Sequence, residues 1–255
     1  VGDEFQIADT NLTESISMSS NGSIVALGSE TSVEVYRVDK SLGTWVRHGY
    51  QITSESSSDS PQFRVSLSSD GSILAVGNLR DSTVKVYKFS ESVSEWIQTG
   101  NTITPNEEGQ LASIFGKSVS LSSDGLTVCV GDPWFPQDRQ GRISVFNYNS
   151  ESDMWVQVGG NIDGEGAFEY LGTHVSLNAD GTVMACSGGL SGIRVFSLQE
   201  DTNEWEQLGD AYKPEGSSPM RVSLNGDGRT VAIAGEITVV LSFDSSNSTW
   251  RQVGS

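Results

Sequence analysis

The chain has 255 residues and carries 33 Asp and Glu against 15 Lys and Arg, which gives a formal net charge of −18. A surface this acidic repels phosphate backbones and anionic lipid, so nucleic acid is excluded as a partner. The longest apolar runs are only strand-sized, as in Thr230–Ala234, and membrane insertion is not predicted. Cys129 and Cys186 are too few for a disulfide framework, and they are either bridged across neighbouring repeats or two buried free thiols.

Two landmarks recur five times along the chain. The turn sequence Ser-Ser-Asp-Gly, or a close variant, places a Gly at Gly22, Gly71, Gly125, Gly181 and Gly228. A Trp-x-x-x-Gly segment follows in each unit, headed by Trp45, Trp96, Trp155, Trp205 and Trp250. Because the order of the landmarks is constant, we divide the chain into units of approximately 1–52, 53–103, 104–162, 163–212 and 213–255, each about one propeller blade long.

Each unit is predicted to contain four strands. In the third unit they are expected at 117–122, 126–131, 142–148 and 154–158, bounded by Gly, Asp, Ser or Asn. No segment repeats apolar residues at helical spacing. Such units bury both faces only by stacking on one another. The sequence therefore predicts an all-β fold, a single five-bladed β-propeller with four antiparallel strands per blade.

The first strand of each unit contains Val-Ser-Leu or a close variant. We expect its Ser to face a neighbouring blade with the hydroxyl hydrogen-bonded, since an unsatisfied buried hydroxyl is costly. These residues are Ser17, Ser66, Ser120, Ser176 and Ser223. The opening residues 1–7 resemble the continuation that the last unit lacks. We therefore expect them beside residues 250–255, where the ring closes.

The third unit carries a recognisable motif. Phe115-Gly116, Asp124-Gly125, the run from Val130 to Pro133 and a Gly-led strand ending at Phe146 resemble FG-GAP repeats of integrin-α-type propellers. The resemblance implies a degenerate repeat of the kind found in algal and bacterial surface proteins. The number of units is similar to that of five-bladed lectin propellers rather than to the seven blades of integrins. The dense Asp-rich calcium loop of that family is absent, so no metal site and no cofactor is expected.

A long connection in the third unit, residues 132–140, is one candidate binding element. It contains Trp134, Phe135 and Arg139 between and after two prolines. Long loops on rigid scaffolds commonly carry recognition. The two aromatic rings either form a platform for a sugar or a peptide, or fold down over the blade edge as a local plug.

A second candidate appears when the units are aligned. The position that precedes the first-strand Ile or Val is Ser15, Arg64, Ser118, His174 and Arg221, with Lys117 one residue earlier. Propeller connectivity brings these strand starts together at one mouth of the channel. We expect Arg64, His174 and Arg221 either to bind a carboxylate, sulfate or phosphate group, or to pair with acids such as Glu14 and Asp59.

The sequence contains no catalytic signature such as HExxH or GxSxG, and only two histidines. Glycosylation is predicted at three Asn-x-Ser/Thr sequons, at Asn11, Asn21 and Asn247. We therefore expect an extracellular or cell-surface, non-enzymatic propeller that binds a glycan or a protein partner within a surface- or wall-associated assembly. The alternatives are a structural building block of a filament or coat without its own ligand, and a hydrolase that uses carboxylates.

Overall fold

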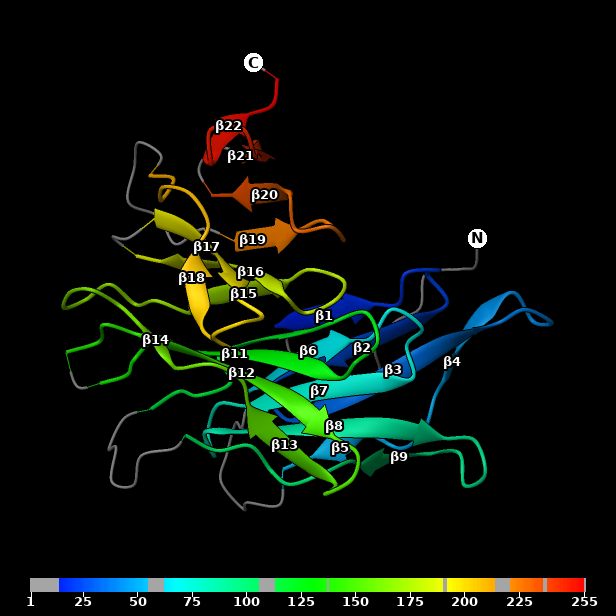
Figure 1. The fold of residues 1–255 in the computed structure, drawn as a ribbon. Coiled ribbons are helices and arrows are strands. Elements are labelled where there is room, and N and C mark those ends of the chain that lie inside the picture. The colour runs from blue at the N-terminus through cyan, green and yellow to red at the C-terminus, as the bar shows by residue number, and fades with distance from the viewer. Residues whose placement is uncertain are drawn as a thin grey trace.

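The fold is seen in a computed structural model, which describes residues 14–54, 62–105, 113–136, 138–189, 192–213, 221–235 and 238–254. In this part of the chain every regular element is a β-strand. The strands form five antiparallel sheets, and within each sheet consecutive strands are neighbours (Figure 1). The predicted all-β, five-bladed propeller with four antiparallel strands per blade is confirmed.

The blades follow the chain order. Blade 1 contains β1 (Ser15–Met18), β2 (Ile24–Gly28), β3 (Ser32–Asp39) and β4 (Thr44–Arg47), with β5 (Ile52–Thr53) paired to β3. Blade 2 contains β6 (Phe63–Leu67), β7 (Ile73–Asn78), β8 (Thr83–Ser90) and β9 (Glu95–Gln98). Blade 3 contains β10 (Ser118–Leu121), β11 (Thr127–Asp132), β12 (Arg142–Asn149) and β13 (Met154–Gln157), with β14 (Ile162–Asp163) paired to β12. Blade 4 contains β15 (His174–Leu177), β16 (Val183–Gly188), β17 (Gly192–Leu198) and β18 (Trp205–Gln207). Blade 5 contains β19 (Arg221–Leu224), β20 (Thr230–Ala234), β21 (Thr238–Asp244) and β22 (Thr249–Gln252).

The first-strand serines join neighbouring blades. The Oγ atom of each accepts a hydrogen bond of 2.9–3.0 Å from the backbone N–H of a Leu in the first strand of the next blade. The pairs are Leu67 with Ser17, Leu121 with Ser66, Leu177 with Ser120, and Leu224 with Ser176. The prediction for these serines is confirmed at four positions. It is wrong for Ser223, which is exposed on blade 5 and whose hydroxyl has no hydrogen-bond partner among the described residues.

The Trp-x-x-x-Gly segments join the blades near the rim. The indole N–H of a Trp donates to a backbone carbonyl of the preceding blade, at 2.7–3.2 Å. The pairs are Trp96 with His48, Trp155 with Thr99, Trp205 with Val158, and Trp250 with Leu208. The next Gly in each acceptor segment has a positive φ and meets that Trp ring, which would lie within 2.7–3.1 Å of an added Cβ. A larger residue would therefore displace the Trp.

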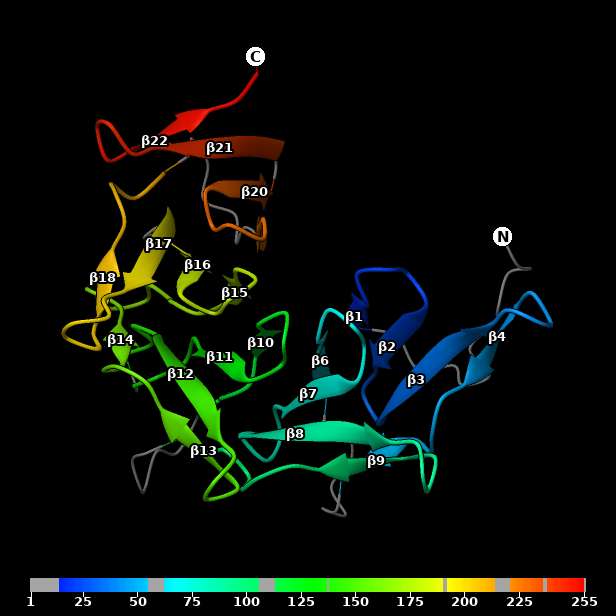
Figure 2. The ribbon, with the colours of Figure 1, turned by 45° about the vertical axis from the view of Figure 1, so that its right-hand side comes forward.

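Figure 2 shows the five sheets as an open arc, with β1 and β2 at one end and β20 and β21 at the other. Residues 1–7, which were expected to close the ring, lie outside the described residues. Both cysteines are free and fully buried, so the free-thiol alternative is confirmed. Cys129 Sγ lies 3.6 Å from Met184 Sδ, and burial raises the pKa of Cys186 to about 12.

The serine bonds allow a direct test. Ser120→Ala leaves the N–H of the buried Leu177 without an acceptor, and we expect the free energy of unfolding to fall by about 1–3 kcal/mol. Ser223→Ala is the matched control and should change it by less than about 0.5 kcal/mol. Urea unfolding followed by Trp fluorescence measures both. Equal effects of the two substitutions would contradict this account.

Candidate functional site

The starts of the five first strands line a cavity of about 740 Å³ at one mouth of the propeller. Every blade contributes a residue, because antiparallel meandering returns each first strand to the same side. The lining includes Ser15 from β1, Arg64 from β6, Ser118 from β10, His174 from β15 and Arg221 from β19. Lys117, Thr173 and Glu14, each directly before a first strand, complete the polar lining. The predicted cluster of Arg64, His174 and Arg221 is thus brought together.

Positive charge is concentrated in this cavity although the chain carries −18 overall. Arg64, Lys117 and Arg221 line it, while Glu14 is the one carboxylate among the described lining residues. Arg64 Nη1 lies 2.6 Å from Glu14 Oε2 and also donates to the carbonyl of Phe63. The predicted pairing of a mouth cation with Glu14 is therefore present, whereas Asp59 lies outside the described residues. Two other cations and a His remain in the cavity with it.

Burial and the nearby cations determine how His174 titrates. Burial, which is the largest cause, and the positive charges of Arg221, Lys117 and Arg64 together lower its pKa to about 4. The imidazole is therefore neutral at pH 7 and has a nitrogen able to accept a proton. Burial, together with Arg64 and Arg221, also lowers the pKa of Lys117, while Glu14 opposes this shift. The arrangement suits a proton acceptor beside a bound anion.

The hydroxyl groups of the cavity have structural partners. Ser118 Oγ donates to the carbonyl of Gly172 at 2.8 Å, and Thr173 Oγ1 donates to the carbonyl of Tyr170 at 2.7 Å. Ser15 Oγ accepts the N–H of Val65. Because each oxygen lies in an interblade or loop contact, none is arranged with His174 as a nucleophile and base. Among the described residues, no group of three or more His, Cys, Asp or Glu side chains could hold a metal ion.

The long connection of blade 3 lies on the same face as the cavity. It follows the end of β11, where Gly131 pairs with Ser118 of β10. The connection is anchored, because Phe168, Tyr170 and Leu171 donate backbone hydrogen bonds to Asp138, Arg139 and Gln140. Buried Asp132 holds its start by accepting from Ser113 Oγ and from the N–H of Ile114.

The two aromatic residues of this connection have different environments. Phe135 is only 5% exposed, and the Arg142 guanidinium lies 3.6 Å from its ring centroid. Trp134 is 40% exposed, and the Arg139 guanidinium lies 5.1 Å from its ring centroid. Of the two alternatives that the sequence left open, Phe135 therefore takes the role of the local plug. Trp134 and Arg139 face solvent. The sequence did not distinguish them, because both are large aromatics beside a proline.

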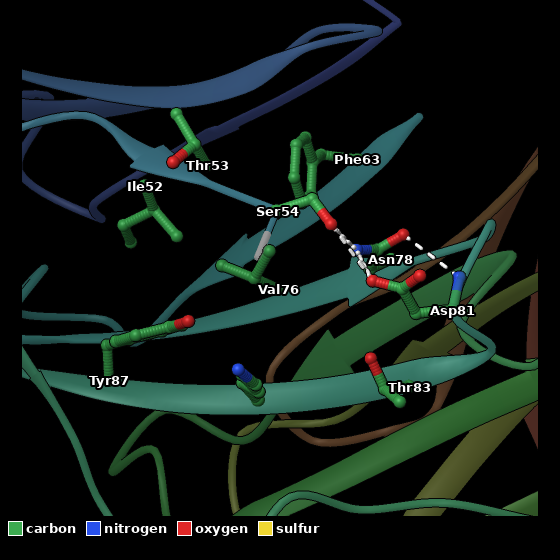
Figure 3. A pocket seen from close by; sticks show the side chains of 10 residues that line it. Ile52, Thr53, Ser54, Phe63, Val76, Asn78, Asp81, Thr83 and Tyr87 are labelled. Atoms are coloured by element: carbon green, nitrogen blue, oxygen red, sulfur yellow. Dashed lines mark hydrogen bonds between the residues drawn. The ribbon is translucent and has the colours of Figure 1, made fainter. Parts of the chain in front are cut away.

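A smaller cavity of about 160 Å³ lies between the β5 segment of blade 1 and blade 2. Figure 3 shows its polar residues together: Ser54 Oγ and Asn78 Nδ2 donate to Asp81 Oδ2, at 3.0 and 2.7 Å. Asn78 Oδ1 in turn accepts the N–H of Asp81. These groups serve the connection between β7 and β8, so the mouth cavity is the stronger candidate site.

The glycosylation sequons can be located only in part. Asn21 and Asn247 are exposed in turns, as acceptors must be. Asn21 Oδ1 accepts hydrogen bonds from the N–H and the hydroxyl of Ser23, and Asn247 Nδ2 lies 3.4 Å from Asp244 Oδ2. Asn11 lies outside the described residues. Within the described ranges, no helical segment has the length and apolar character of a membrane span.

No family model matches the sequence, and no curated protein matches it either. Solved structures do share the fold. The periplasmic gluconolactonase of Pseudomonas aeruginosa superimposes with a TM-score of 0.69 at 19% identity, over 98% of this chain and 73% of its own. A candidate 6-phosphogluconolactonase from Bacteroides uniformis gives 0.68 at 16% identity, over 94% and 70%. A second candidate 6-phosphogluconolactonase, from Bacteroides fragilis, gives 0.65 at 15% identity.

These neighbours correct the functional expectation. The sequence suggested a non-enzymatic binding propeller, but the neighbours whose names state an activity are lactonases, which are hydrolases. The prediction that the protein is not an enzyme is contradicted by the same finding. No contiguous motif marks the mouth cavity in the sequence, because its residues come from five separate strands.

The two aromatics of the blade 3 connection provide a prediction. Phe135→Ala should lower the free energy of unfolding by about 3–5 kcal/mol, since it removes a buried ring and the surface against which Arg142 packs. Trp134→Ala is the matched control on the adjacent residue, and should change the free energy of unfolding by less than about 1 kcal/mol because Trp134 is 40% exposed and Phe135 only 5%. Thermal and urea unfolding measure both. A larger loss from Trp134→Ala would contradict this assignment.

Proposed function

We propose that the protein is a lactone hydrolase that opens the ring of an anionic sugar-acid lactone in the mouth cavity. The observation that carries this proposal is the convergence of Arg64, Lys117 and Arg221 around a neutral His174 in a cavity of about 740 Å³. The alternative of a hydrolase that uses carboxylates is retained in modified form, since the cavity offers Glu14 and a histidine rather than a pair of carboxylates. The names of the structural neighbours support the same reaction class.

Binding would rest on charge. A phosphate or carboxylate on the substrate is attracted by the cations, and burial strengthens that attraction relative to bulk water. Arg64 is oriented by Glu14 and by the carbonyl of Phe63, so its guanidinium is held in place before substrate arrives. Trp134 and Arg139 lie on the same face of the molecule, and we place them at the approach to the cavity rather than in the chemistry.

Hydrolysis would begin with water. His174 accepts a proton from a water molecule while the water oxygen attacks the lactone carbonyl carbon. The carbonyl oxygen becomes an oxyanion, which the neighbouring cations stabilise. The C–O bond of the ring then breaks, and the protonated imidazole returns its proton to the departing alkoxide oxygen. The product is an open-chain hydroxy acid. Water is the nucleophile, so no hydroxyl group of the protein forms a bond to the substrate.

Several finer expectations remain predictions. One neighbour is named as periplasmic, and with the exposed sequons this supports an extracellular or cell-surface location. The FG-GAP resemblance of the third unit, glycosylation at Asn11, Asn21 and Asn247, and a glycan or protein partner are expectations of the same kind. Each rests on the sequence patterns given above.

The activity test uses two substrates. We expect the protein to hydrolyse 6-phosphogluconolactone with a higher kcat/KM than gluconolactone, because only the first carries the phosphate that the cations would bind. Arg221→Ala should raise KM for the phosphorylated substrate about tenfold or more, with little change for the neutral one. Arg229→Ala, in the exposed turn after β19, is the matched control. Hydrolysis no faster than in buffer for both lactones would overturn the proposal.

The pH dependence tests the role of His174. Its neutral form is the proton acceptor, so kcat/KM, which reports the groups of the free protein, should be constant from about pH 5 to neutrality and fall as the pH drops through about 4. His174→Gln should lower kcat about 100-fold or more and remove this acid limb. Initial rates by pH titration of the released acid give both profiles. An acid limb that persists in His174→Gln would assign the proton transfer to another group.

A further inference from the structure

Four side chains form a patch beside the mouth cavity. We call it the aromatic patch, and it consists of Trp134 and Arg139 from the blade 3 connection and of Phe168 and Tyr170 from the segment that leads to β15. The Arg139 guanidinium lies 5.1 Å from the Trp134 ring centroid, and its Nη1 donates to the Tyr170 hydroxyl oxygen at 3.4 Å. The ring centroids of Phe168 and Tyr170 are 6.4 Å apart. The four side chains therefore form one continuous surface.

The backbone holds this patch in an unusual conformation. Phe168 and Tyr170 donate backbone hydrogen bonds of 2.9 and 3.0 Å to the carbonyls of Asp138 and Arg139. The φ angles of Arg139, Phe168 and Tyr170 are 60°, 62° and 54°, which lie in the left-handed region. This region is uncommon for residues other than glycine, and a bulky side chain there is an outlier. Because such outliers cluster at functional sites, three of them in one patch indicate a role beyond packing.

The groups of the aromatic patch can contact a ligand. Four Trp side chains of the rim use the indole N–H to bind a carbonyl of the preceding blade. The indole N–H of Trp134, by contrast, has no hydrogen-bond partner within the described part of the chain, and Arg139 forms no ion pair there. Phe168 is 55% exposed. Since Trp, Tyr and Arg are the residues most enriched at binding hot spots, the patch has the composition of a recognition surface.

The aromatic patch adjoins the mouth cavity through both of its segments. Tyr170 lies three residues before Thr173, which lines the cavity and donates its hydroxyl to the Tyr170 carbonyl. Trp134 lies three residues after Gly131, which pairs with Ser118 of the cavity wall. Three residues span at most about 11 Å. A ligand made of two linked rings therefore has the length to occupy the cavity and the patch together.

The charge of the molecule limits the chemical class of this ligand. A net charge of −18 repels acidic peptides and anionic lipid headgroups, whereas an uncharged ligand is not repelled. A sugar ring is such a ligand. Its C–H face buries apolar area against an aromatic ring, and its hydroxyl oxygens accept hydrogen bonds from a guanidinium and from an indole N–H. Aromatic faces, Arg139 and the Trp134 indole supply this combination of groups.

We infer that the aromatic patch binds a sugar unit joined to the lactone in the mouth cavity, so that the substrate is the lactone end of a short oligosaccharide. The lactone ring lies beside His174, and the attached ring packs on Trp134 and Tyr170. Hydroxyl groups of the attached ring accept from Arg139 and from the Trp134 indole. The identity of the ring in the cavity rests on the proposed lactonase activity, whereas the sugar site on the patch does not.

The kinetic test compares uncharged lactones of one and two sugar units, so that the charge of the mouth cavity cancels. The substrates are gluconolactone and the lactones of cellobionate, maltobionate and lactobionate. In the unaltered protein, kcat/KM for the best disaccharide lactone should exceed that for gluconolactone about tenfold or more. Trp134→Ala should lower this ratio about tenfold, and Trp134→Phe should restore part of it because an aromatic face is kept. Tyr50→Ala is the matched control, since it removes a side chain that is 77% exposed on blade 1, and it should leave the ratio unchanged.

A second measurement does not need turnover. Saturation-transfer difference NMR with cellobiose, maltose and lactose should show transfer to the non-reducing ring in the unaltered protein and in Tyr50→Ala, and its loss in Trp134→Ala. A kcat/KM ratio near one, or a ratio that Trp134→Ala does not lower, overturns the inference and leaves the lactonase activity standing. Hydrolysis of none of the lactones, including 6-phosphogluconolactone, overturns the proposed function instead. In that case, transfer that Trp134→Ala abolishes supports the sugar site, and transfer that is absent or unaffected overturns it.

Discussion

The hydrogen bond between a Leu N–H of one blade and a Ser Oγ of the preceding blade is the contact on which the arrangement depends. The N–H lies on a first strand, which has a sheet partner on only one side. Without an acceptor from the neighbouring blade, this buried donor would be unsatisfied in the middle of the molecule. The Ser supplies that acceptor and is small enough to let the sheets approach closely. The stacking of the blades therefore also provides the hydrogen-bond acceptors that the N–H groups of the first strands need.

The same requirement positions the site. Since each first strand is held in register against the next, the residues at their starts form a ring at one mouth. Cations can occupy such a ring only where it is open to water or contains a counterion. Arg64 is paired with Glu14. Burial first, and then repulsion among the cations, lowers the pKa values of Lys117 and His174. A site that favours neutral bases also favours an incoming anion, because the anion relieves the repulsion among the cations.

The outer surface and the cavity have opposite charge, and this contrast has a functional consequence. A chain with a net charge of −18 repels most anions at a distance, but the potential near the mouth is dominated by three cations. Small anions that reach the mouth would be retained there, while nucleic acid is too large to avoid the acidic surroundings. The cavity is thus suited to small anionic molecules rather than to polyanions.

The sequence by itself determined the local structure, because it depends on short-range rules. The Asp-Gly turns, the alternating strands and the recurring Trp-x-x-x-Gly segments were sufficient to predict five four-stranded blades, and Val-Ser-Leu was sufficient to predict bonded serines at four of five positions. It also placed Arg64, His174 and Arg221 at one mouth, since blade alignment puts equivalent residues at equivalent places.

Only the tertiary structure decided that Phe135 is buried and Trp134 is exposed, because that depends on the packing of Arg142. It alone showed that the Ser223 hydroxyl has no hydrogen-bond partner among the described residues, since Ser223 lies on the outer face of an end blade. The pKa of His174 likewise depends on charges from three other blades, and their distance from the imidazole is set by the stacking of the sheets.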